Sequence, residues 1–98
     1  MKKIVDTIQI PMELNNYIES LSYEVECRKS LLAFAMEKGL VETDSFKRYD
    51  QEYRECYMKF DIAKQDMYDK YIKEKYDGKD VNWQLFYNTG IVEIYKED

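Results

Sequence analysis

The chain has 98 residues, of which 45% are hydrophobic and 36% charged, and its formal net charge is −5. This length fits one small domain over residues 1–98, and the hydrophobic content excludes an intrinsically disordered chain. The acidic balance argues against nucleic acid as a partner, because binding to phosphates needs clustered positive charge. The sequence has no apolar run long enough for a signal peptide or a bilayer span, so we expect a cytoplasmic protein that contacts no membrane.

The first predicted element is a β-strand over residues 1–10. Apolar and polar residues alternate there, with Asp6 as the exception on an otherwise apolar face. That face would hold three isoleucines, Ile4, Ile8 and Ile10. Pro11 follows the strand and suits the first position of a helix, because proline has no N–H to lose there.

Two helices are predicted next, over residues 11–38 and 44–76. In each helix apolar residues recur at alternating spacings of four and three, the pattern of helices that pack along a shared seam as in a coiled coil. The first seam comprises Leu14, Ile18, Leu21, Val25, Arg28, Leu32 and Ala35, and the second comprises Phe46, Tyr49, Tyr53, Cys56, Phe60, Ala63 and Met67. Gly39 is expected to end the first helix in a left-handed conformation, and residues 43–45 offer three candidate N-caps for the second.

The second seam loses its period near Met67. A strict continuation would place Lys70 and Glu74 inward. The better apolar positions are Tyr68, Tyr71, Ile72 and Tyr76. We interpret the change as a new packing surface, on which the last turns of the helix meet the terminal strands.

A β-hairpin is predicted over residues 81–95, with a glycine-containing loop at Asn88-Thr89-Gly90. An isolated hairpin is marginally stable in water, so the N-terminal strand is the expected third member of its sheet. Trp83 would lie between this sheet and the helices. The predicted fold class is therefore α+β, a long antiparallel helical hairpin with a small antiparallel sheet formed by the N-terminal strand and the C-terminal β-hairpin.

Arg28 stands out because it occupies an otherwise apolar seam. In an antiparallel hairpin it lies level with the middle of the second helix, so Glu52 and Glu55 are expected partners, as is Glu24 one turn earlier. One interpretation is a polar contact that sets the register of the two helices, and the other is an arginine that binds an anion.

Catalytic chemistry has little support in the sequence. The chain has no histidine, which removes the commonest general base and the commonest metal ligand. Cys27 and Cys56 are expected to be half-buried free thiols, as is usual in the cytoplasm. We therefore predict no catalytic residues, no cofactor and no metal site, and interpret the chain as a non-enzymatic protein.

Four residues are predicted to contact a partner. Tyr57 and Tyr68 fit the seam poorly and are candidates for a partner-facing edge. Phe86 and Ile91, together with Val5, are expected on the sheet face that the helices leave uncovered, where burial would favour a homo-oligomer. The favoured function is an interaction or assembly protein that self-associates or binds a protein or peptide partner.

Two resemblances suggest alternatives. Residues 7–36 begin with TIQIPMEL and contain RKSLL at 28–32. This segment resembles ribbon-helix-helix proteins, which implies a DNA-binding regulator that reads the major groove through Thr7 and Gln9 and has a helix break near Glu26. The layout of the whole chain is also similar to small uncharacterised accessory proteins of low-GC Gram-positive bacteria, encoded in phage-like or peptide-modification loci. That similarity implies an accessory role in a peptide-modification system.

Overall fold

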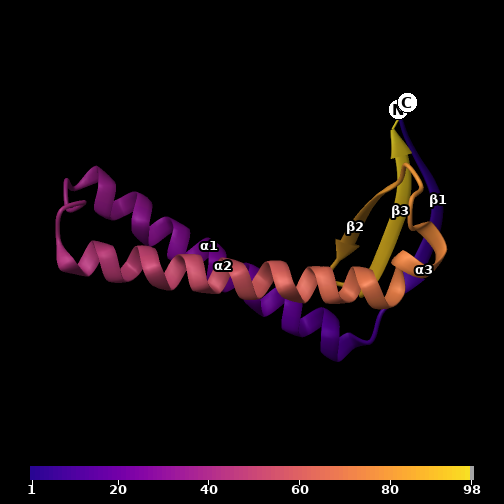
Figure 1. Ribbon diagram of the computed structural model, residues 1–98, viewed down its shortest axis with the longest axis horizontal. Helices are drawn as coiled ribbons and strands as arrows, with labels where there is room; N and C mark the ends of the chain where they lie inside the picture. Colours follow the sequence, from indigo (N-terminus) through magenta and orange to yellow (C-terminus); the bar gives the residue numbers. More distant parts are fainter. Residues whose placement is uncertain (98) are drawn as a thin grey trace. The chain divides into compact units, whose positions relative to one another are not determined.

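The computed structural model describes residues 1–97 and confirms the α+β class, with a helical hairpin and a three-stranded antiparallel sheet (Figure 1). Its elements in chain order are β1 (Lys2–Gln9), α1 (Met12–Glu37), α2 (Asp44–Tyr71), α3 (Lys73–Tyr76), β2 (Asn82–Phe86) and β3 (Ile91–Glu97). The chain groups into two compact units. The hairpin unit is Ile18–Ala63, and the sheet unit is Met1–Tyr17 with the chain from Lys64 onward. That these form a single domain stays a prediction.

The turn of the helical hairpin follows the predicted chemistry. Gly39 adopts a φ of 69°, and its N–H donates to the Met36 carbonyl while the Leu40 N–H donates to the Ala35 carbonyl. This pair of hydrogen bonds is the Schellman arrangement that ends a helix at a left-handed glycine. Thr43 is the N-cap of α2, because its hydroxyl accepts a hydrogen bond of 3.1 Å from the Phe46 N–H.

The helix predicted over residues 44–76 is interrupted at Ile72, because α2 ends at Tyr71 and α3 is a separate short helix. Ile72 lies between them with a φ of −112°, far from the helical value of about −63°. Its side chain is fully buried, and Tyr76 one turn later donates its hydroxyl to Asp6 at 2.8 Å. The break therefore coincides with a buried side chain and precedes a residue attached to β1.

The two predicted seams hold all the buried positions of their helices except Asn15. In the hairpin unit Ile18, Leu21, Val25, Ala35, Cys56 and Ala63 are at most 6% exposed. The remaining seam residues of this unit, including Arg28, are half-buried. Beyond the seam, Lys70 and Glu74 are exposed and Ile72 is buried, as the change of period predicts.

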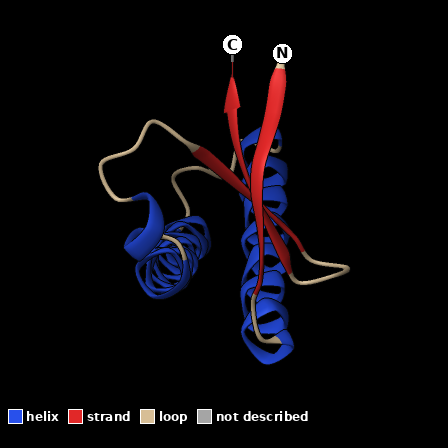
Figure 2. Cartoon of the chain, turned by 90° about the vertical axis from the view of Figure 1, so that its right-hand side faces the viewer, coloured by secondary structure: helices blue, strands red, loops and turns tan. Residues whose placement is uncertain are grey.

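The sheet has the order β1-β3-β2, with both pairs antiparallel (Figure 2). A register shift between Ile4 and Asp6 makes Val5 a β-bulge. The prediction that Ile4 shares a face with Ile8 is therefore wrong, since the bulge reverses the alternation and leaves Ile4 51% exposed.

The inner face of the sheet carries Val92 and Ile94, which are fully buried. Asp6 and Trp83 stand opposite Ile94 on the two neighbouring strands, so Asp6 lies on the inner face, where Tyr76 satisfies it. The core of the sheet unit comprises Ile10, Asn15, Met67, Ile72, Val92 and Ile94, each at most 1% exposed.

Candidate functional site

Arg28 connects the two helices of the hairpin unit at mid-height. Its guanidinium contacts Glu52 at 2.9 Å and Glu24 at 3.0 Å, and its side chain is 32% exposed. The hydrogen bond to Glu24, followed by the field of that carboxylate and the contact with Glu52, raises the pKa of Arg28. Glu55, the other expected partner, accepts a hydrogen bond from Gln51. With two carboxylates on it, the guanidinium is occupied within its own fold; that it sets the register stays a prediction.

The two thiols differ in exposure, and both are free. Cys56 is buried near Arg28 and Glu24. Burial, together with the Glu24 carboxylate, raises the pKa of its thiol. A thiol held in the protonated form is a poor nucleophile. Cys27 is exposed on α1, so the expectation of two half-buried thiols is wrong at both positions.

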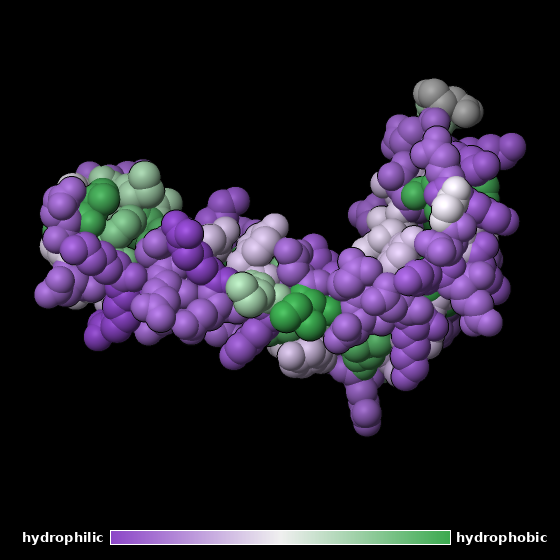
Figure 3. Space-filling view, viewed as in Figure 1, coloured by the Kyte–Doolittle hydropathy of each residue, from purple (hydrophilic) through white to green (hydrophobic). Residues whose placement is uncertain are grey.

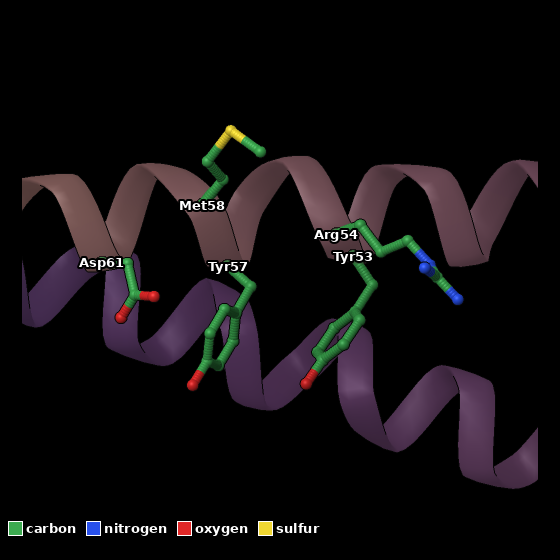
Figure 4. A pocket seen from close by; sticks show the side chains of 5 residues that line it. All are labelled: Tyr53, Arg54, Tyr57, Met58 and Asp61. Atoms are coloured by element: carbon green, nitrogen blue, oxygen red, sulfur yellow. The ribbon is translucent and has the colours of Figure 1, made fainter.

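The hairpin unit has a shallow, open groove on α2, which we call the α2 groove. Its volume is about 380 Å³, and it is lined by Tyr53, Arg54, Tyr57, Met58 and Asp61. The rings of Tyr53 and Tyr57 lie 6.1 Å apart in a tilted arrangement and project from the same side of the helix (Figure 4). Tyr57 is 44% exposed and Met58 is 63% exposed. The groove therefore has an apolar centre with a cation towards one end and an anion towards the other.

Further apolar side chains are exposed on α1 and around the hairpin turn, where Figure 3 shows them gathered. On α1 the spacings four, four and three connect Tyr23, Cys27, Leu31 and Phe34 along one stripe away from the seam. Around the turn, Met36, Leu40 and Val41 are also exposed. Single exposed apolar residues are common on proteins, whereas here they are grouped along one helix stripe and around one turn.

The outer face of the sheet is smaller and partly covered. Phe86 stands directly opposite Ile91 there, and both are half-buried. The Lys2 ammonium lies 4.5 Å from the centre of the Tyr95 ring and 6.0 Å from that of Phe86. The lysine lies over these aromatic rings, whereas Ile4, which stands opposite Tyr95 on the same face, is 51% exposed.

The four predicted partner residues do not form one surface. Tyr57 belongs to the hairpin unit and lines the α2 groove, whereas Phe86 and Ile91 are neighbours on the outer face of the sheet. Tyr68 is half-buried in the sheet unit. Sequence reasoning missed Met58 and Ile62, although the signal was present: two apolar residues spaced by four, away from the seam.

Within residues 1–97 no group of three or more histidine, cysteine, aspartate or glutamate residues is arranged to hold a metal ion. Nor does any helix in this described part of the chain combine the length and apolar character needed to cross a membrane. Comparisons with protein-family models, curated proteins and solved structures find no match for this chain.

Proposed function

We propose that this chain is a non-enzymatic interaction protein whose hairpin unit presents an apolar surface to a protein partner. The observation that carries the proposal is the uneven distribution of exposed apolar side chains, since most of the large ones in the described chain belong to the hairpin unit. These are Tyr23, Leu31, Phe34, Met36, Leu40, Val41, Tyr57, Met58 and Ile62.

Folding of the hairpin does not account for these residues. The seams already supply its buried side chains, and the exposed set lies outside them. Fully burying a large apolar side chain contributes about 1.5–3 kcal/mol, so each of these partly exposed side chains leaves a fraction of that free energy unused. A partner that covers the α2 groove would recover part of this free energy, with tyrosines that lose little conformational entropy on binding.

The ribbon-helix-helix alternative has less support. It requires a helix break near Glu26, whereas α1 continues from Met12 to Glu37. The accessory role in a peptide-modification system rests on the layout of the sequence alone.

Site-specific photo-crosslinking tests the proposal. A photoreactive phenylalanine analogue replaces Tyr57 in the full-length chain, which is then irradiated in the cells that make it. Lys59 provides the matched control, because it is exposed on the same helix outside the groove. We expect a protein crosslink from position 57 and none from position 59. Equal yields from both positions, or none from either, would contradict the proposal.

A further inference from the structure

The charges that flank the α2 groove have a symmetry that points to its occupant. Arg54 and Asp61 lie at equal distances along the sequence from the midpoint between Tyr57 and Met58, one before it and one after it. At a rise of 1.5 Å per residue, each charge lies about 5 Å along the helix from that midpoint. A surface with opposite charges at equal distances from its centre is complementary to itself when one copy is turned around.

We infer that the α2 groove binds the α2 groove of a second copy of this chain, with the two helices antiparallel about a two-fold axis. This inference rests on the proposed function and names its partner. The axis passes between Tyr57 and Met58, so the tyrosine of each copy packs beside the methionine of the other. Arg54 of each copy then lies level with Asp61 of the other, and both ion pairs form at once.

The same charges disfavour the opposite orientation. With parallel helices, Arg54 would face its own counterpart and Asp61 would do likewise, which places like charges together at both ends. The antiparallel arrangement also closes on itself, because a two-fold contact uses the same surface on both copies and leaves none for a third.

The existing contact of Arg54 does not prevent the intermolecular pair. Its Nε atom donates to Asp50 on the same helix at 3.0 Å, and its side chain is 76% exposed. A guanidinium carries five N–H donors, so its terminal amino groups can reach a second carboxylate. Because the contact involves one helix face per copy, it is smaller than a standard interface, and we expect a dissociation constant on the order of tens of micromolar.

Sedimentation equilibrium of the full chain at low ionic strength tests the inference with charge reversals. Arg54→Glu and Asp61→Arg each convert both ion pairs into repulsive contacts, and we expect each to weaken the dimer by about tenfold or more. The double variant R54E/D61R restores opposite charges at both contacts in the antiparallel dimer, and should regain the affinity of the unmodified chain. In a parallel dimer the double variant would remain repulsive.

Lys59→Glu is the matched control, since it reverses one exposed charge on α2 outside the groove. It changes net charge as Arg54→Glu does and should leave the dissociation constant within about twofold. Thermal unfolding of each variant, followed by circular dichroism, verifies that the helices remain folded. A chain that stays monomeric at high micromolar concentration, or a double variant as weak as the single ones, would overturn the inference.

Crosslinking separates failure of this inference from failure of the proposed function. In a Cys27→Ser background, a mixture of Arg54→Cys and Asp61→Cys chains should form a mixed disulfide under mild oxidation, whereas Arg54→Cys alone should not. If position 57 crosslinks in cells only to a different protein, the proposed function stands and the second copy is wrong. If it crosslinks to nothing, both are wrong.

Discussion

Ile72, Val92 and Ile94 of the sheet unit are fully buried, whereas Phe34 and Ile62 of the hairpin unit are more than half exposed. In the sheet unit three strands and the helix ends cover a common core, although Ile4 and Tyr17 there are also about half exposed. Two helices alone can bury only the facing stripe of each, so apolar residues outside the seam stay in water. Under the proposed function, the sheet unit supplies fold stability and the hairpin unit supplies the contact surface.

The largest expected effect is the difference in stability loss between two isoleucine-to-alanine substitutions, one in each unit. Ile94→Ala removes a fully buried side chain from the central strand and should lower the free energy of unfolding by about 2–5 kcal/mol. Ile62→Ala makes the same chemical change at a side chain that is 54% exposed and should cost less than about 1 kcal/mol. Urea unfolding of both variants measures the contrast. Similar losses would show that the two units do not differ in burial as described.

Two glycines extend the comparison to the turns. Gly90 has a φ of 72°, and a Cβ there would lie 2.8 Å from both the Gln9 amide nitrogen and the Met12 sulfur. That amide donates to the Thr89 carbonyl at 3.0 Å, so displacing it costs a hydrogen bond in addition to backbone strain. Gly90→Ala should therefore cost roughly 2 kcal/mol or more.

Gly39→Ala meets no atom within 4 Å at a φ of 69°, so it carries the backbone strain alone and should cost about 1 kcal/mol. Differential scanning calorimetry of the two variants measures both losses. Equal shifts in melting temperature would argue against the close packing around Gly90.

A smaller effect is expected at Arg28. The Arg28→Leu variant should keep the fold, with a free energy of unfolding within about 1 kcal/mol of the unmodified chain or slightly higher, because partly exposed ion pairs contribute little and leucine suits the seam. Chemical denaturation measures this change. A loss of several kcal/mol would mean that the ion pairs with Glu24 and Glu52 dominate hairpin stability.

The smallest effect is a pH dependence in the sheet unit. The hydrogen bond from Tyr76 lowers the pKa of Asp6, with the Thr7 N–H and Lys75 acting in the same direction. A lowered folded-state pKa gives stability that is present above the unfolded value of about 3.9 and is lost as pH falls through the folded value. Tyr76→Phe should therefore reduce the stability that is lost as the pH falls, measured by thermal unfolding between about pH 2 and 5. If the variant loses as much stability on acidification as the unmodified chain, the result would argue against this contact in solution.

Regular patterns in the sequence predicted much of the fold, and single contacts were harder to foresee. The heptad spacing identified the buried seams, and Gly39 and Thr43 identified the hairpin turn, because each follows from local chemistry. The bulge at Val5 and the break at Ile72 depend on attachments between distant segments, such as that of Asp6 to Tyr76. The α2 groove was half predicted: Tyr57 was identified by its poor fit to the seam, whereas Met58, spaced by four from Ile62 outside the seam, was missed.

Accessibility of position 58 tests the central claim most directly. Met58→Cys, in a Cys27→Ser background, is labelled with a membrane-permeant maleimide in the cells that make the protein and again after purification and dilution. Lys59→Cys is the control. If a protein covers the groove, position 58 should react slowly in cells and rapidly after dilution, while position 59 reacts rapidly in both. Equally rapid labelling of position 58 in cells and after dilution would contradict the assignment of the hairpin unit as a contact surface.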